Sequence, residues 1–283
     1  TTLLAFIADV HVLIHFWFLC RLNIQLKSVY CILFNLDLFL HMHLIFEISI
    51  LVILIIVQSI FGVGLLLFGT PSFLLLGYDF ANTINILMPV SVLVSLMQFF
   101  RSKVQDKNFI IQYNIYCLPF LILFLILALK LRELIDFKFF VALLLIFSSI
   151  LILNKKRFSS FKGIFIKLKK IILIIIGSIH GFTNMGGSFL SIFSTLVSGN
   201  KKELARYYIS YGYLIMGVIQ YLIVLLLTYD LLNFSKLYYA LIALIIYFPS
   251  QKIFNGISDN KFSKYINIIA LLYGIIIIFS YVI

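Results

Sequence analysis

Long apolar runs, each long enough to cross a membrane as a helix, recur along this chain and restrict what it can fold into. A helix needs about 20 mostly apolar residues to span the hydrocarbon core of a bilayer. Hydrophobic residues make up 63% of the chain and charged residues only 11%, whereas a soluble domain carries about 25% charged residues. With a mean hydropathy of +1.16, the sequence predicts an all-α integral membrane protein, a polytopic helical bundle.

Basic residues give the chain a formal net charge of +12. In a soluble protein this excess would indicate a nucleic-acid partner. Here nearly all Lys and Arg lie in short gaps between apolar runs, as expected of loops at the cytoplasmic face. We therefore expect the lipid bilayer as partner, no nucleic acid, and a multi-pass protein of the cell inner (plasma) membrane.

Residues 1–41 differ from the rest of the chain. They hold the only Trp, three of the five His and two of the three Cys. Met42 stands immediately before a clean apolar helix. Two interpretations of this atypical N-terminal segment stay open: it is an extra membrane hairpin, or it is upstream sequence that does not belong to the working protein.

From Met42 onward the same order of elements occurs twice. Residues 42–154 form the first transmembrane repeat and residues 155–283 the second, with a basic linker, Asn154–Lys170, at their junction. Together the repeats form one transport domain. The expected helices are Leu44–Phe61, Ala81–Phe100, Phe109–Leu129 and Phe137–Leu153 in the first repeat, and a helix leading to His180, then Leu204–Leu227, Leu231–Phe248 and Tyr265–Ile283 in the second.

Each repeat carries a glycine-rich motif inside an apolar run. The first is Gln58-Ser59-Ile60-Phe61-Gly62-Val63-Gly64, followed by a short apolar piece to Leu76. The second is His180-Gly181-Phe182-Thr183-Asn184-Met185-Gly186-Gly187-Ser188, followed by a piece to Val197. Gly181, Gly186 and Gly187 permit backbone that a helix would not adopt. Because such backbone is tolerated in a bilayer only where it is buried in protein or lines a cavity, each repeat is expected to contain a glycine-broken helix.

The distribution of Lys and Arg favours inverted repeats over parallel ones. If each motif piece crosses the membrane, the second repeat is inverted and the loops carry 16 basic residues inside and 4 outside. If the pieces are re-entrant, the count is 11 against 9. The positive-inside rule favours inversion, which places Arg101–Asn108, Gly199–Arg206 and Ser250–Lys264 in the cytoplasm with the linker and leaves Lys130–Lys138 and Asp230–Lys236 outside.

Two broken helices that meet near the midplane would suit an anion. Half-helices that begin after Gly64 and Gly187 would present free N–H groups and the positive ends of their dipoles. No Lys or Arg lies inside a core segment. The alternative is that the glycines only let helices pack closely. The candidate substrate-binding residues are Gln58, Gly62, Gly64, Thr70, Ser72, His180, Thr183, Asn184, Gly186, Gly187 and Ser188.

His180 is the only titratable group within the two motifs. It could bind the anion when charged or carry a proton, which makes protons a candidate coupling ion. The alternative is a neutral His whose ring bonds a backbone carbonyl. Asp79, which precedes Ala81 and a long apolar run, is expected to cap the next helix.

An enzyme is not expected. The sequence has no His/Asp/Glu cluster with metal-ligand spacing, no nucleophile–base spacing and no phosphate loop. Its cysteines, Cys20, Cys31 and Cys117, have no metal-ligand spacing and form no disulfide framework. We therefore assign no catalytic residues, no metal and no cofactor.

The two motifs resemble those of the sulfite exporter TauE/SafE family of membrane transporters. The resemblance rests on Gln58…Phe61-Gly62-Val63-Gly64…Pro71…Gly77…Ala81 and on His180-Gly181…Asn184-Met185-Gly186-Gly187…Lys201-Lys202…Ala205, and it extends from Met42 to Ile283. It implies export of a small anion such as sulfite, an organosulfonate or a related organic acid across the inner membrane. Family members commonly carry three consecutive glycines, where this chain has Gly62-Val63-Gly64 and Gly186-Gly187-Ser188.

The sequence therefore predicts a membrane transporter that exports a small anion by alternating access. The alternative is a non-transporting membrane assembly or sensing protein whose glycine motifs only pack helices. A polar cavity that reaches both motifs would favour transport, and a dry, tightly packed midplane would favour the alternative. The identity of the substrate, the direction of transport and the oligomeric state stay open.

Overall fold

The computed structural model describes residues 44–131, 134, 162–199, 201–229, 236–259, 261, 262, 264, 265 and 268. The atypical segment 1–41, the expected helix Phe137–Leu153, the first half of the linker and most of the expected helix Tyr265–Ile283 lie outside these residues. The chain forms two compact units, Thr1–Ser49 and Ile50–Ile283. Every contact considered below lies within the second unit.

The described residues are almost entirely helical and include no strand. A first helix, Leu44–Phe61, is followed by α3 (Leu65–Leu75), α4 (Phe80–Arg101), α5 (Lys107–Tyr116), α6 (Leu118–Lys130), α9 (Lys162–Lys167), α10 (Lys169–Thr183), α11 (Gly187–Val197), α12 (Lys202–Leu227) and α13 (Tyr239–Gly256). Among these residues, four segments are long and apolar enough to cross a membrane: Leu44–Phe61, α4, the α5–α6 segment and α12. The protein is a helical membrane protein.

Large apolar side chains cover the outer faces of these helices. Ile111 and Ile115, one turn apart on α5, are 55% and 57% exposed, and Leu226 on α12 is 81% exposed. In water, apolar surface of this extent would mark an interaction site or an aggregation liability. On spanning helices it is the surface that lipid tails cover.

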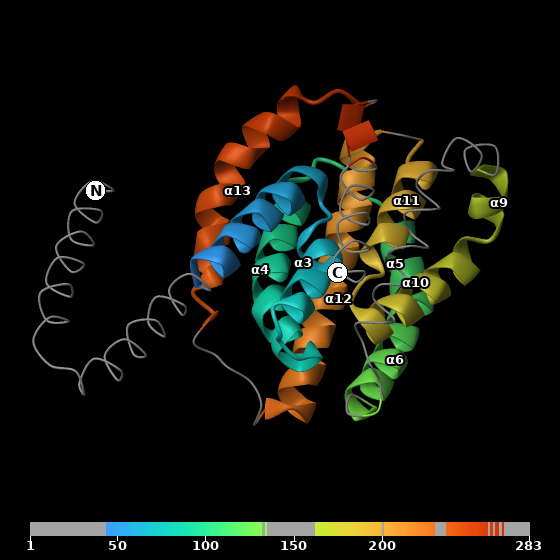
Figure 1. Cartoon of the computed structure of the whole chain (residues 1–283). Helices are drawn as coiled ribbons and strands as arrows, with labels where there is room; N and C mark the ends of the chain where they lie inside the picture. Colours follow the sequence, from blue (N-terminus) through green and yellow to red (C-terminus); the bar gives the residue numbers. More distant parts are fainter. Residues whose placement is uncertain are drawn as a thin grey trace, which may run out of the picture. The chain divides into compact units, whose positions relative to one another are not determined.

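The antiparallel pair α4 and α12 forms the centre of the second unit (Figure 1). Midway along the pair, Gly217 lies so close to Val92 that a Cβ at this glycine would be 2.6 Å from the Val92 side chain. At one end, the rings of Phe99 and Tyr207 stack with centroids 5.4 Å apart. The C-terminal end of α4 therefore meets the N-terminal end of α12.

A second close pair joins α10 to α6 (Figure 1). Gly177 and Gly181 lie one turn apart on α10, and Cβ atoms there would be 2.1 Å from the Cys117 carbonyl oxygen and 2.3 Å from the Leu121 carbonyl oxygen. Small residues at this spacing let two backbones touch in a membrane. The expectation that Gly181 lies in non-helical backbone is therefore wrong: α10 continues through it to Thr183.

The backbone leaves the helical conformation at one point in each motif. After Phe61 it turns at Gly62, which has φ of 79°, before α3 begins at Leu65. After α10 it turns at Asn184, which has φ of 62° and caps the helix in the left-handed conformation. Gly and Asn are the residues that adopt this conformation at least cost.

Two expected helix ends have different outcomes in the structure. Asp79 caps α4 as expected, since its carboxylate accepts the main-chain N–H of Asn82 at 2.9 Å. The expected end of α13 at Phe248 is wrong, because the helix runs on through Pro249 to Gly256. The ammonium group of Lys202 donates to the Ile257 carbonyl oxygen at 2.5 Å and thereby satisfies a free main-chain acceptor just past the end of this polar extension.

Asp106 ties the start of α5 to α12. Its carboxylate accepts the Tyr208 hydroxyl at 2.6 Å and the Phe109 main-chain N–H at 3.0 Å. Burial raises the pKa of Asp106, but these two hydrogen bonds and the charge of Lys169 outweigh burial and hold the pKa below its ordinary value. The ionised carboxylate therefore stabilises the folded state at neutral pH, and this contribution is lost as acid protonates it.

The contact between α10 and α6 predicts a strong effect of a single methyl group. Gly177→Ala should lower stability by about 1–3 kcal/mol, because the new Cβ meets a backbone carbonyl that cannot rotate away. Gly163→Ala is the matched control, since a Cβ there has open space. Thermal unfolding of both purified variants in one detergent measures the difference, and equal melting temperatures would contradict the described packing.

Candidate functional site

A hydrogen bond joins the second motif to the helix that follows the first. The side-chain amide of Asn184 donates to the Thr70 hydroxyl at 2.9 Å, and the two residues are 114 positions apart in the chain. Both side chains are fully buried. The break after α10 thus lies directly against the middle of α3. We call this contact between Asn184 and Thr70 the motif crossing.

Gln58 holds the first break from inside the protein. Its amide nitrogen donates to the hydroxyls of Ser91 and Ser95 at 2.9 and 3.1 Å. Its amide oxygen accepts the main-chain N–H of Leu65, the first residue of α3, at 3.2 Å. In this structure Gln58 therefore fastens the start of α3 to α4, and its carbonyl oxygen occupies one of the helix N-terminal donors.

The start of α11 lies against the middle of α12. A Cβ at Gly187 would be 1.5 Å from the Tyr213 hydroxyl oxygen, so a larger residue cannot occupy this position without moving the ring. Gly186 is equally confined, with a Cβ position 2.5 Å from the His180 Cβ. These two glycines are required by the close contact among α10, α11 and α12.

His180 faces this same contact. Its ring is fully buried and lies edge-on to the Tyr213 ring, with centroids 6.1 Å apart. Among the described residues, neither ring nitrogen of His180 nor the Tyr213 hydroxyl has a hydrogen-bond partner. The nearby amide of Gln220 donates instead to the His180 main-chain carbonyl at 3.4 Å.

The remaining candidates are placed less centrally. The Thr183 hydroxyl donates within its own helix to the Ile179 carbonyl at 2.7 Å. The Ser72 side chain is partly exposed. The main chain of Ser188 lies in the first turn of α11, and its side chain is outside the described residues. Gly62 and Gly64 lie in the turn before α3.

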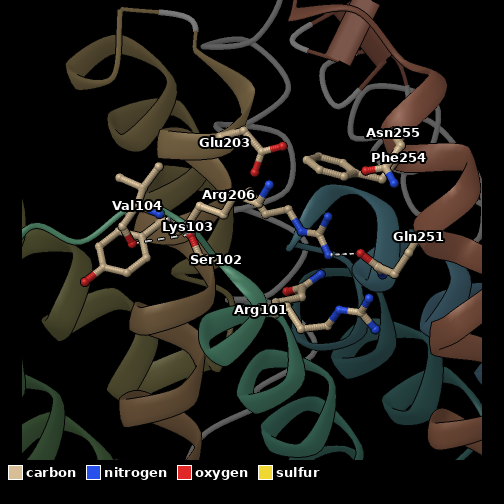
Figure 2. A pocket seen from close by; sticks show the side chains of 11 residues that line it. Arg101, Ser102, Lys103, Val104, Glu203, Arg206, Gln251, Phe254 and Asn255 are labelled. Carbon is tan, nitrogen blue, oxygen red and sulfur yellow. Dashed lines mark hydrogen bonds between the residues drawn. The ribbon is translucent and has the colours of Figure 1, made fainter.

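A pocket of about 370 Å³ opens near the first break (Figure 2). Its walls come from three separate segments: the C-terminal end of α4 with the residues that follow, the first turns of α12, and the C-terminal part of α13. From the positive-inside rule we expect all three at loops or helix ends on the cytoplasmic side. Its lining includes none of the candidate residues, so this pocket does not reach either motif.

Arg206 is the buried cation of this pocket and was not among the sequence candidates. It is 7% exposed, and its guanidinium donates to the Gln251 side-chain oxygen at 2.6 Å and lies 3.9 Å from the centre of the Phe254 ring (Figure 2). The sequence predicts Arg206 at the edge of a loop. The available signal was that three basic segments were expected at one face and so could converge.

The structure thus brings Thr70, His180, Asn184, Gly186 and Gly187 to one buried contact and places Gln58, Gly62 and Gly64 at a neighbouring one. Two residues at this contact are absent from the sequence candidates: Tyr213, whose ring lies edge-on to His180, and Gln220, whose amide donates to the His180 carbonyl. Among the described residues, no group of His, Cys, Asp and Glu is arranged to hold a metal ion. No family model matches the chain, and no curated protein or solved structure matches it either.

A double-mutant cycle tests the motif crossing. Thr70→Val and Asn184→Gly each remove one partner while keeping volume or the left-handed backbone, and their coupling energy should be about 1 kcal/mol. Thr83→Val is the control, because its buried hydroxyl has no partner among the described residues. Thr83→Val with Asn184→Gly should be additive in thermal unfolding. Additivity in the first pair as well would show that the Asn184–Thr70 bond contributes nothing.

Proposed function

We propose that this protein is a transporter of a small anion that works by alternating access around the motif crossing, in the cell inner membrane. The observation that carries this proposal is the Asn184–Thr70 hydrogen bond. It joins the non-helical turn after α10 to the middle of α3, the helix that follows the turn in the first motif, inside a bundle of apolar helices. Transporters with discontinuous helices bind their substrates at such meeting points.

The ends of the helices support inverted repeats. The pocket residues Arg101, Arg206 and Gln251 come from the end of α4, the start of α12 and the end of α13. The inverted arrangement requires these three ends on one face of the membrane, whereas the re-entrant arrangement separates the first from the other two. Their convergence agrees with the 16-to-4 distribution of basic residues.

The groups at the motif crossing suit an anion better than a cation. The N-cap residues of α3 and α11 are glycines without a side-chain cap, so the positive dipole end of each helix is not covered by its own N-cap side chain. The Gln58 oxygen bonded to Leu65 N–H has the place that a ligand oxygen would take. The resemblance to sulfite exporters points to sulfite, an organosulfonate or a related organic acid.

The crossing is closed in this conformation, so transport requires α3 or α11 to move. Gly187 touches the Tyr213 hydroxyl, and the Thr70 hydroxyl accepts a hydrogen bond from Asn184. The unpartnered ring nitrogens of His180 lie at this same closed contact. His180 is therefore the candidate proton carrier if protons drive the cycle.

A second candidate function is a non-transporting assembly or sensing protein. Two observations favour it. The described pocket reaches neither motif, and Gly177 and Gly181 pack closely against α6, which uses glycine for helix contact alone. A flux measurement separates the two functions. Proteoliposomes that contain the protein should take up sulfite, methanesulfonate or propionate faster than empty vesicles do. If none of the three anions enters faster than it enters empty vesicles, the second function is favoured.

A charge placed at the motif crossing should block transport. Asn184→Asp is nearly isosteric and keeps a hydrogen bond with Thr70, whose hydroxyl can donate to the carboxylate. Its negative charge should repel the anion and lower flux by at least about tenfold, equivalent to ~1.4 kcal/mol. Asn108→Asp makes the same change at an exposed position and should transport normally. Normal flux in a correctly inserted Asn184→Asp variant would show that the anion does not bind at the motif crossing.

Topology gives an independent prediction. In a background without native cysteines, Lys201→Cys should resist a membrane-impermeant maleimide added to intact cells, whereas Leu237→Cys should react. Both positions are exposed, so the difference reports the side of the membrane. Reaction of Lys201→Cys from outside would mean that the motifs are re-entrant and the repeats parallel.

A further inference from the structure

The pocket at the ends of α4, α12 and α13 is strongly biased toward positive charge. Three cationic side chains line it, those of Arg101, Lys103 and Arg206, and a single acid, Glu203. In Figure 2 the guanidinium groups of Arg101 and Arg206 both extend toward the α13 side of the cavity. A concave surface with one sign of charge raises the local concentration of the opposite ion.

Arg206 is incompletely satisfied by the protein. Its guanidinium makes a hydrogen bond with Gln251, and the Tyr247 hydroxyl lies beside it. Its Nε–H has no partner among the described residues, and the side chain is only 7% exposed. A buried cation with unused donors is costly unless an acceptor completes it. A carboxylate or sulfonate supplies two acceptor oxygens in the geometry that a guanidinium matches.

The other walls of the pocket fit a short apolar group. Phe254, Tyr207 and Val104 line the cavity together with the charged residues. A volume of about 370 Å³ lies at the small end of the range for ligand pockets. The cavity therefore suits a small organic anion better than a macromolecular segment.

The pocket also contacts the helix that precedes the first break. The Gln251 amide donates to the Ser59 carbonyl at 3.2 Å, and the Gln98 amide donates to the Gln58 and Ser59 carbonyls at 2.6 and 3.1 Å. Arg206 holds the oxygen of the same Gln251 side chain. An anion that draws Arg206 away from Gln251 thus acts on the last turn before Gly62.

We propose that this pocket is an anion-binding site of its own, in which Arg206 and Arg101 bind the oxyanionic group of a small organic acid. Its lining shares no residue with the motif crossing. Binding here is an equilibrium property that does not require transport. In this proposal the anion first binds at the end of the bundle where α12 begins and where α4 and α13 end.

Calorimetric titration of the protein in lipid nanodiscs tests the site. Propionate and ethanesulfonate should bind saturably, whereas propionamide, which has the shape of propionate without its charge, should not bind. Arg206→Gln should weaken binding by about tenfold or more, and Arg101→Gln should weaken it several-fold. Lys252→Gln is the matched control: it removes one positive charge from an exposed position next to Gln251 and outside the lining, and it should bind as the unmodified protein does.

Because Arg206 is buried, one further variant, Arg206→Lys, together with Arg101→Gln keeps the test decisive. Arg206→Lys retains the charge but loses the paired donors, so it should bind several-fold more weakly. Arg101 is exposed, so Arg101→Gln should fold normally. The proposal is overturned if neither anion binds, if Arg206→Lys and Arg101→Gln bind as the unmodified protein does, or if Lys252→Gln weakens binding as much as Arg101→Gln.

The outcome is independent of the transport proposal. Saturable binding with no flux would keep the pocket and remove the transporter function. If Arg206→Lys and Arg101→Gln bind the anions as the unmodified protein does and flux is also unchanged, the transporter function stands and the proposed binding site is overturned.

Discussion

Inside a bilayer, every main-chain N–H and C=O group must find a partner in the protein itself, and the two helix breaks depend on this requirement. At the first break three glutamine side chains provide partners. Gln58 accepts the first N–H of α3, while Gln98 and Gln251 donate to carbonyls of Gln58 and Ser59 in the last turn before Gly62. At the second break, Asn184 turns the chain and uses its own side chain to reach Thr70. The amide side chains of these Gln and Asn residues thus provide hydrogen-bond partners inside the protein where the backbone leaves the helical conformation.

The same amides connect regions that differ in chemistry. Gln251 bonds Arg206 on one side and Ser59 on the other, so a charged pocket and an apolar turn share one side chain. The motif crossing carries no Lys or Arg among the described residues that form it, whereas the pocket carries three cations. In the proposed transport cycle, an anion would therefore meet full charges in the pocket and mainly dipoles at the motif crossing, where a buried charge is most costly.

The sequence predicts the spanning helices well because length and apolar character alone define them. The expected span Leu44–Phe61 has the observed bounds, and α4 extends one residue beyond each expected end. The end of α10 was predicted too early, since a packing glycine such as Gly181 looks the same in sequence as one that breaks a helix. Arg206 and Tyr213 were missed because their roles arise only when α12 meets α4, α11 and α13, which no local pattern records.

The contact between Gly187 and Tyr213 couples two positions over evolutionary time. Since a Cβ at residue 187 would lie 1.5 Å from the hydroxyl oxygen of Tyr213, residue 187 cannot gain a side chain while the tyrosine keeps its position, whereas residue 213 can become smaller while Gly187 is kept. A descendant of this chain can gain a side chain at 187 only after its aromatic partner has become smaller, and it can keep the tyrosine only while it keeps the glycine. Steric overlap therefore fixes the order in which substitutions at these two positions can accumulate: residue 213 first, residue 187 second.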